Sequence, residues 1–451
     1  MFASRLARSS WRVSAATLQT TAAPVSAGNV TINKCQNYVP VVARSVCTSP
    51  VPQKPSKTFV EKAVYNGPKD VTESMAHLKT IEVAFGDKTR SLYPHVWLRE
   101  NCQCHQCFNG DAIARVILVD ELDLNIKPKE IQLVNGGLRV IWPDGHNSVY
   151  AGQWLHQRSF TDEARAKQRS EFALKKVLWG SDFKVHKMDF NLAMTDDRAL
   201  LEWLIILEKY GIILVENSPQ KTGPLLDFIN RLGFARPTHY GTSYELQTEA
   251  IPNNLAYTGS KLGLHTDLPY VDYPPGTTWL HCIRQHEGKG GDNDLSDGVH
   301  AAHLLKERNR TLYDVLTRAP IYFQDAGFET YDFRKITKAP TIQLDEEGNI
   351  SRLNISSQSR DSLMDLDAEG VLLFYKALKA FNDILYEISI RVKTKPGDML
   401  VLDNFRVLHG RTPFDPSTAS GKRLLHNAYI DWSELRSKRR VLQKKFGMEL
   451  E

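Results

Sequence analysis

The sequence predicts a mixed α+β protein, mainly β, in which a small β-rich N-terminal domain precedes a larger double-sheet barrel flanked by helices. Two observations support this fold class. Residues 76–158 contain short segments in which apolar and polar residues largely alternate, separated by Gly, Asn and Asp. Residues 180–435 mix amphipathic helices with many short strand-like runs. With 451 residues, 42% of them hydrophobic, the chain can form more than one core.

The N-terminal domain is placed at residues 76–160. Strands are expected at residues 80–85, 131–134 and 138–142, where apolar residues recur at about every second position between turn-forming residues. Residues 61–75 are expected to form a linker that precedes this domain.

The larger domain is placed at residues 180–440, after a charged, helix-prone connection over residues 160–177. A helix is expected at residues 196–209, because a cluster of capping residues opens it and Gly211 follows it. The apolar run that continues to Val215 predicts a buried strand. Charged residues interrupt every long apolar stretch, so no membrane-spanning segment is expected.

Two more helices are expected toward the C-terminus. Apolar residues recur at helical spacing at Phe374, Leu378, Phe381 and Leu385. The basic segment at residues 436–445 is expected to be a solvated helix.

The first sixty residues differ in composition from the rest of the chain. They contain seven of the 57 Lys and Arg residues, no Asp or Glu, and many Ser, Thr and Ala. This composition is typical of a mitochondrial transit peptide, so we expect residues 1–60 to direct the chain to the mitochondrial matrix. An ordinary disordered tail is the alternative, and a cytosolic location follows if the presequence is not used. The remainder carries 50 basic and 52 acidic residues, which gives no general case for nucleic-acid binding.

Three of the six cysteines are clustered in a C-x-C-x2-C pattern, at Cys102, Cys104 and Cys107. A tetrahedral zinc ion needs a fourth ligand. His105 lies inside the cluster and has little freedom to complete a tetrahedron, so we favour His146, on an expected turn between two strands. Four protein ligands would make the zinc structural, and reduced structural thiols are the alternative.

A second set of candidate ligands lies in the larger domain. His265 and Asp267 form the only His-x-Asp/Glu pattern in the chain, and His409 lies far downstream, where it is expected to end the strand-like run at residues 398–403. A single histidine on an apolar strand is usually a packed core residue. Two histidines and one carboxylate, however, can bind one face of Fe(II) and leave the other face for a keto acid and O2. Arg423, fourteen residues after His409, offers a bidentate fork for the far carboxylate of that co-substrate.

Together these motifs resemble the γ-butyrobetaine dioxygenase and trimethyllysine dioxygenase family, the paired hydroxylases of carnitine biosynthesis. The resemblance covers about residues 80–440 and is carried by residues 92–107, 142–146, 253–258, 265–267, 274–276, 281–283, 403–411 and 423–429. It implies a double-stranded β-helix (jelly-roll) domain with His265, Asp267 and His409 on iron. It also implies Arg423 on 2-oxoglutarate, O2 as the other co-substrate, a homodimer, and stimulation by ascorbate.

The resemblance further implies a small trimethylammonium substrate. A quaternary cation has no hydrogen to donate, so aromatic faces hold it. By motif matching, the aromatic cage comprises Tyr240, Tyr244, Tyr257 and Tyr429, although tyrosines that simply pack in a barrel would look the same in the sequence. Asn254 and Ser356 would orient the substrate carboxylate, and Asn293 would help to bind 2-oxoglutarate.

The choice of substrate depends on a few positions. The complete cysteine cluster and Asn254 favour hydroxylation of γ-butyrobetaine to L-carnitine, whereas the presequence is typical of the trimethyllysine enzyme, which is the alternative. Three residues depart from the butyrobetaine pattern: Tyr244 replaces Trp, Ser356 replaces Asn, and Asn293 replaces Ser or Thr. The first two leave the substrate open, and the third keeps a hydrogen-bond donor. A non-catalytic metal-binding scaffold is less favoured because no ligand of the trio is missing.

Overall fold

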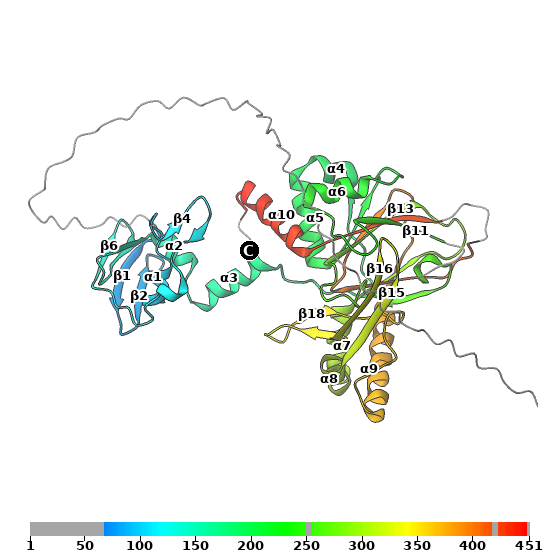
Figure 1. Cartoon of the computed structure of the whole chain (residues 1–451). Helices are drawn as coiled ribbons and strands as arrows, with labels where there is room; N and C mark the ends of the chain where they lie inside the picture. Colours follow the sequence, from blue (N-terminus) through cyan, green and yellow to red (C-terminus); the bar gives the residue numbers. More distant parts are fainter. Residues whose placement is uncertain (1–66, 249–254, 417–422, 449–451) are drawn as a thin grey trace, which may run out of the picture. The chain divides into compact units, whose positions relative to one another are not determined.

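The computed structural model describes residues 67–248, 255–416 and 423–448 (Figure 1). The expected presequence and Asn254 lie outside these residues. Within the described ranges, no helix combines the length and the apolar character needed to cross a membrane.

The N-terminal region contains two small antiparallel sheets. One has the strand order β1 (Val71–Ala76), β2 (Thr80–Phe85), β3 (Arg90–Pro94), and the other has the order β6 (Glu130–Val134), β7 (Gly137–Ile141), β8 (Asn147–Tyr150). The remaining elements are short: α1 (His95–Glu100), β4 (Phe108–Asn109), β5 (Ala114–Arg115), η1 (Val119–Glu121) and α2 (Gly152–Gln157). Side chains from both sheets, including Val83, Tyr93, Val140 and Trp142, form one buried core. The three predicted strands are therefore present.

The predicted linker at residues 61–75 is wrong at its C-terminal end. Residues 71–75 belong to β1, in which Val71 is fully buried and pairs with Phe85 of β2. Only Val71 of this strand is buried, so the strand lacks the alternation on which its prediction would depend. Its place in the sheet is set by pairing with β2.

The larger domain is built on two facing sheets. The first has the strand order β11 (Ser243–Gln247), β22 (Leu424–Ile430), β13 (Thr277–Arg284), β20 (Met399–Asp403), β10 (Ile212–Glu216), β9 (Lys187–Asp189). The second has the order β12 (Leu262–His265), β21 (Val407–Arg411), β14 (Asn293–Asp297), β19 (Ile390–Val392). Neighbouring strands are far apart in the sequence, as in jelly rolls. Leu280 and Leu402 of the first sheet share one core cluster with Leu295 and Val407 of the second.

Four helices cover the outer face of the first sheet: α4 (Phe190–Thr195), α5 (Asp197–Tyr210), α6 (Pro224–Leu232) and α10 (Trp432–Lys445). Strand alternation divides β20 between two cores, because Val401 packs against these helices and Leu402 packs between the sheets. The predicted helix at residues 196–209 is present as α5. The Asp196 side chain accepts hydrogen bonds from its first turn, and Gly211 ends it with a φ of 76°.

A second group of elements packs on the outer face of the smaller sheet. It comprises α7 (Gly298–Arg308), α8 (Arg310–Arg318), β15 (Pro320–Phe328), β16 (Asp332–Pro340), β17 (Ile342–Leu344), β18 (Ile350–Leu353) and α9 (Ala368–Glu387). The predicted apolar stripe of α9 is largely buried here, because Phe374, Phe381 and Leu385 share a cluster with Leu408 of β21. Two further helices are α3 (Asp162–Phe172), within the predicted connection, and η2 (Leu255–Tyr257). The mixed class and the double sheet with flanking helices agree with the sequence.

The prediction that residues 436–445 form a solvated helix is only half right. The segment is helical, but Arg439 is fully buried in α10 and donates to Glu208 Oε2 at 2.7 Å. Arg436 donates to the other oxygen of Glu208 at 3.0 Å, and Arg439 also donates to Gln443. The basic composition concealed this arrangement because the acidic partner lies on α5, far away in the sequence.

Removing one partner of this buried ion pair should be strongly destabilising. We expect Arg439→Met to lower the free energy of unfolding by about 3 kcal/mol, because Glu208 loses its fully buried partner. Urea denaturation of the purified chain measures this. Lys444→Met, on the exposed face of the same helix, serves as the control, and an equal loss in both variants would contradict the role of the pair.

Candidate active site

The two candidate histidine ligands lie on paired strands of the smaller sheet. His265 ends β12 and is directly opposite His409 of β21, and Asp267 follows two residues later. The sequence placed His409 at the end of the run at residues 398–403, but that run is β20, in the other sheet. His409 instead occupies a strand of its own, which the short turn at residues 404–406 separates from β20.

The three predicted ligands are brought together with one atom of each within 4.8 Å of the others. Asp267 Oδ1 lies 3.5 Å from Nε2 of His265 and 3.5 Å from Nε2 of His409. His265 Nδ1 is 2.9 Å from the Gly263 carbonyl oxygen, which can only accept a hydrogen bond. This contact fixes the proton on Nδ1 and leaves the Nε2 lone pair available for a metal ion.

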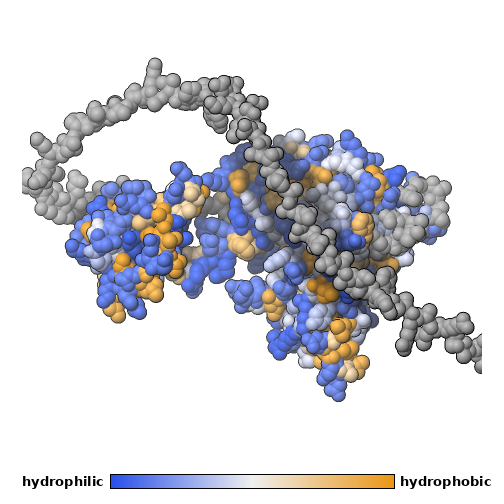
Figure 2. All heavy atoms as spheres, in the orientation of Figure 1, coloured by the Kyte–Doolittle hydropathy of each residue, from blue (hydrophilic) through white to orange (hydrophobic). Residues whose placement is uncertain are grey.

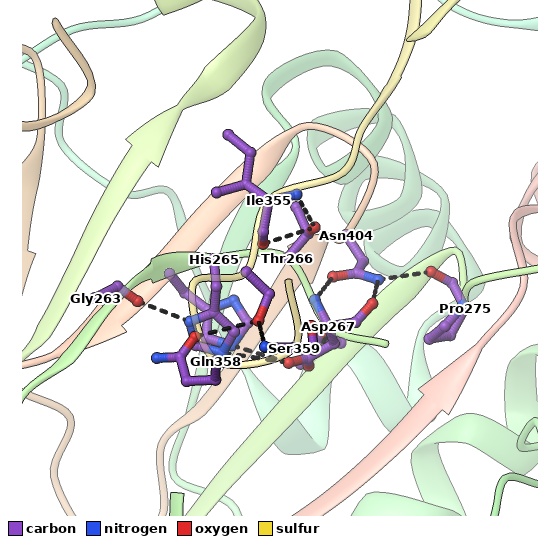
Figure 3. Close-up of polar contacts among 12 residues, drawn as sticks. Gly263, His265, Thr266, Asp267, Pro275, Ile355, Gln358, Ser359 and Asn404 are labelled. Atoms are coloured by element: carbon purple, nitrogen blue, oxygen red, sulfur yellow. Dashed lines mark hydrogen bonds and ion pairs between the residues drawn. The ribbon is translucent and has the colours of Figure 1, made fainter. Parts of the chain in front are cut away.

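Hydrogen bonds hold both the side chain and the backbone of Asp267. Its second oxygen, Oδ2, accepts from Thr278 Oγ1 at 2.9 Å and from the Tyr429 hydroxyl at 3.3 Å. Its backbone is clamped by Asn404, whose Oδ1 accepts from the Asp267 N–H at 2.7 Å and whose Nδ2 donates to the Asp267 carbonyl at 3.0 Å. Asn404 also donates to the Pro275 carbonyl (Figure 3). Sequence reasoning missed Thr278, which lies between the motifs at residues 274–276 and 281–283, and Asn404, which lies within the motif at residues 403–411.

The charge states of these residues suit a divalent cation. Burial alone would raise the pKa of Asp267, but His409, His265 and the Thr278 hydrogen bond outweigh burial and hold this pKa well below its usual range. Burial lowers the pKa of His409 to about 4, against the opposing charge of Asp267. At neutral pH the site therefore presents a carboxylate and a neutral imidazole, the forms that bind metal ions.

A cavity of about 310 Å³ adjoins the three ligands between the two sheets. From β22 and the residue before it, Arg423, Leu425, Asn427 and Tyr429 all line the cavity, because alternate residues of a strand share one face. Arg423 is buried and its Nε donates to Gln285 Oε1 at 3.2 Å. Burial lowers the pKa of Arg423 to about 10, which still leaves it positively charged at neutral pH.

The other predicted cavity residues converge on the same space. Asn293, at the start of β14, lines the cavity and donates through Nδ2 to the Val392 carbonyl at 3.2 Å. Ser356 lines it as well and is buried. Asn254 lies outside the described residues.

All four predicted cage tyrosines line the cavity: Tyr240, Tyr244, Tyr257 and Tyr429. The rings of Tyr240 and Tyr244 stack with centroids 4.6 Å apart, and those of Tyr244 and Tyr429 lie 6.1 Å apart. The Tyr244 and Tyr429 hydroxyls are 2.9 Å apart. Since Tyr429 also donates to Asp267, the aromatic wall and the candidate metal ligands form one connected unit.

The predicted zinc ligands of the N-terminal region also meet. His146 Nε2 lies 3.3, 3.6 and 3.5 Å from the sulfur atoms of Cys102, Cys104 and Cys107. Tetrahedral zinc, with bonds of about 2.3 Å to sulfur and 2.0 Å to nitrogen, would separate these atoms by roughly 3.6 Å. His105 is exposed and is not among the grouped ligand atoms. Burial raises the pKa of the Cys107 thiol to about 11, although Arg99 donates to its sulfur at 3.4 Å, so a bound metal ion would be needed to hold it as a thiolate.

The facing sheets, the His-Asp-His donors and the buried arginine define a class, the non-haem Fe(II)- and 2-oxoglutarate-dependent dioxygenases. A family model described as taurine catabolism dioxygenase TauD, TfdA family, matches residues 173–429, and one described as gamma-butyrobetaine hydroxylase-like, N-terminal, matches residues 74–156. The chain is 36% identical to the γ-butyrobetaine dioxygenase of Homo sapiens over 373 residues, which are 82% of this chain and 95% of that protein. The chain belongs to the γ-butyrobetaine dioxygenase family and is a dioxygenase.

Two more distant relatives mark the breadth of this family. The γ-butyrobetaine dioxygenase of Pseudomonas sp. (strain AK-1) is 30% identical over 367 residues, covering 81% of this chain and 94% of that protein. The mitochondrial trimethyllysine dioxygenase of Rattus norvegicus is 30% identical over 362 residues, covering 78% of this chain and 82% of that protein.

Proposed function

We propose that this chain hydroxylates γ-butyrobetaine to L-carnitine. The observation that carries the proposal is that one cavity of about 310 Å³ is lined by the His265, Asp267 and His409 trio, by buried Arg423, and by four tyrosines. A small acid with a quaternary ammonium group needs each of these features. The similarity to the human enzyme supports the same substrate.

In this proposal His265, Asp267 and His409 hold Fe(II), and Arg423, with Asn293, binds the far carboxylate of 2-oxoglutarate. Iron, when bound, would supply O2 activation coupled to decarboxylation of 2-oxoglutarate to succinate and CO2. The Gly263 carbonyl keeps His265 in the tautomer that ligation needs. Thr278 holds the Asp267 carboxylate in place through its second oxygen.

The remaining task of the chain is to position one C–H bond and to exclude water. The tyrosine faces attract the trimethylammonium group, a contribution of about 2 kcal/mol when the cation is desolvated. Ser356 and Asn254 would orient the carboxylate at the other end of the substrate. The Tyr429 hydroxyl donates a hydrogen bond to Asp267 Oδ2, and this contact fixes the position of the cage relative to the metal ligands.

Trimethyllysine is the second candidate substrate. Tyr244 and Ser356 stand where the butyrobetaine pattern has Trp and Asn, and trimethyllysine dioxygenases are among the relatives of this chain. A weaker cation–π partner at position 244 and a shorter side chain at position 356 both relax the fit to γ-butyrobetaine.

Competitive turnover decides between the two substrates. Purified protein with Fe(II), 2-oxoglutarate, O2 and ascorbate is given γ-butyrobetaine and trimethyllysine together, and both hydroxylated products are quantified. We expect the kcat/KM for γ-butyrobetaine to be at least tenfold higher. A preference for trimethyllysine would overturn the assignment. If neither substrate supported succinate formation, a non-catalytic scaffold would be favoured.

Other properties complete the proposal. The presequence would direct the chain to the mitochondrial matrix, and the related rat enzyme is named as mitochondrial. Ascorbate would stimulate turnover, as the family resemblance implies.

The protein would act as a homodimer. Exposed apolar side chains on and near α9, including Leu363 and Leu372, would supply surface for such contacts (Figure 2). Light scattering of the purified chain at micromolar concentration reads out the dimer.

The proposed zinc site makes a separate prediction. We expect one zinc ion per chain in the purified protein, and Cys104→Ser should reduce the zinc content severalfold or more, because it removes one of four ligands. Elemental analysis measures this. His105→Ala is the matched control and should retain zinc. Retention of zinc by the cysteine variant, or its loss from the histidine variant, would refute the proposed ligand set.

A further inference from the structure

Asp325 is a charged residue of the cavity that has no role in the mechanism above. Asp267 and Asp325 are the carboxylates among the described residues that line the cavity, and Asp325 is the one outside the metal trio. It lies on β15, in the β15–β16 hairpin, which is remote in sequence from every motif considered above. It is only partly exposed, and its Oδ1 accepts a hydrogen bond from the neighbouring backbone N–H of Ala326 at 3.0 Å.

Asp325 is linked to the tyrosine cage through Tyr270. Burial raises the pKa of Tyr270 well above its usual range, interactions with the Tyr240 and Asp325 side chains raise it further, and all three residues line the cavity. Tyr240 in turn stacks on Tyr244, with ring centroids 4.6 Å apart. The Asp325 carboxylate is therefore linked to the tyrosines that would bind the trimethylammonium end of the substrate.

The hydrogen bonds behind Tyr270 have a single consistent direction. Lys335 Nζ lies 3.4 Å from His239 Nδ1, and an ammonium group can only donate, so His239 carries its proton on Nε2. That Nε2 lies 3.3 Å from the Tyr270 hydroxyl and donates to it. Tyr270 is then free to donate its own proton to Asp325, which as a carboxylate can only accept.

Lys335 forms no ion pair with Asp325 within 4.0 Å. The two residues are directly opposite each other in the hairpin register. The lysine ammonium nevertheless contacts His239, and among the described residues no ion pair within 4.0 Å involves Asp325. The negative charge of Asp325 can therefore attract a cation bound in the cavity.

We propose that Asp325 is a specificity-determining residue, whose charge makes the cavity select a positively charged head group over a neutral group of the same shape. This inference rests on the proposed function. A trimethylammonium group cannot donate a hydrogen bond, so a carboxylate favours it through charge alone, and this attraction is strong where water is excluded. The tyrosine faces supply the shape and a cation–π attraction, and Asp325 adds a further preference for positive charge.

The experiment compares two ligands of nearly identical shape. One is γ-butyrobetaine, and the other is 5,5-dimethylhexanoate, in which carbon replaces the quaternary nitrogen. Dissociation constants are measured without O2, on full-length protein loaded with Fe(II) and 2-oxoglutarate. Turnover of γ-butyrobetaine is measured in parallel. The variants are Asp325→Asn, which keeps the shape and removes the charge, and Asp332→Asn, an exposed position on the same hairpin, as the matched control.

We expect Asp325→Asn to weaken binding of γ-butyrobetaine about tenfold, to change binding of 5,5-dimethylhexanoate less than twofold, and to leave kcat within about twofold. Asp332→Asn should match the wild type. Tyr270→Phe should give an intermediate loss for the cation, because it removes the hydroxyl that interacts with Asp325.

Two results would overturn the inference. If Asp325→Asn changed neither dissociation constant, the charge of Asp325 would not contribute to binding. If it weakened binding of both ligands equally, Asp325 would have a packing role. In either case, turnover by the wild type keeps the proposed function intact. If the wild-type protein neither hydroxylates γ-butyrobetaine nor binds it more tightly than the isostere, the proposed function fails and the inference fails with it.

Discussion

Replacing His265 with alanine should abolish 2-oxoglutarate turnover. We expect the rate of succinate formation to fall on the order of a thousandfold or more, because removing a metal ligand should exceed the 10- to 100-fold loss typical for groups that only support a ligand. Iron content and succinate formation are the measurements.

A matched histidine variant separates loss of the ligand from loss of the fold. His303 is exposed on α7 and does not line the cavity, so His303→Ala should retain wild-type activity. Both variants should unfold at similar urea concentrations. Activity that persists in His265→Ala would refute the assignment of the iron site.

Replacing Arg423 with methionine should weaken the binding of 2-oxoglutarate far more than that of the trimethylammonium substrate. We expect the KM for 2-oxoglutarate to rise on the order of a hundredfold, because hydrogen bonds to charged groups contribute about 1.5–3 kcal/mol and a guanidinium can make two to one carboxylate. The KM for γ-butyrobetaine should change less than about threefold. Steady-state kinetics with each substrate varied in turn gives both values.

Arg308→Met supplies the control for this change. Arg308 pairs with Glu387, both side chains are about half exposed, and neither lines the cavity. An equal rise in both KM values for Arg423→Met would indicate general damage to the cavity. An unchanged KM for 2-oxoglutarate would remove Arg423 from the proposed co-substrate site.

Much of the fold could be predicted because local patterns determine it. Helix α5 has a capping aspartate, an apolar face and a terminal glycine, and the strands β2 and β7 alternate clearly. β1 was missed because only Val71 of its side chains is buried and its partner strand fixes its register. The buried state of Arg439 was missed because Glu208, its partner, lies 231 residues away in the chain.

The candidate site divides in the same way. His265 and Asp267 are recognisable because they are two residues apart, and the tyrosines were assigned by motif matching. Supporting contacts such as that of Asn404 with Asp267 join residues 137 positions apart, and only the pairing of the strands brings them together. Asp325 had no local signal either, since a single aspartate on a hairpin is usually a solvated residue.

The cavity also explains why separate sequence motifs belong to one site. β22 contributes Asn427 and Tyr429 through strand alternation, and Arg423, the residue before β22, continues the same face, so residues proposed to bind the co-substrate and the substrate lie side by side. Asn427 was missed because the sequence does not show which face of β22 is turned inward. Because Asn427 shares that face with Tyr429, we expect its side-chain amide to make a polar contact near the tyrosines.

The central claim is that this cavity couples consumption of 2-oxoglutarate to hydroxylation of a trimethylammonium acid. The most direct test is to quantify succinate and L-carnitine from the same reaction of purified protein with Fe(II), 2-oxoglutarate, O2 and γ-butyrobetaine. We predict that the two products form in a one-to-one ratio and that both disappear in His265→Ala. Succinate that does not rise above the level without substrate, or L-carnitine that forms without 2-oxoglutarate, would contradict the claim.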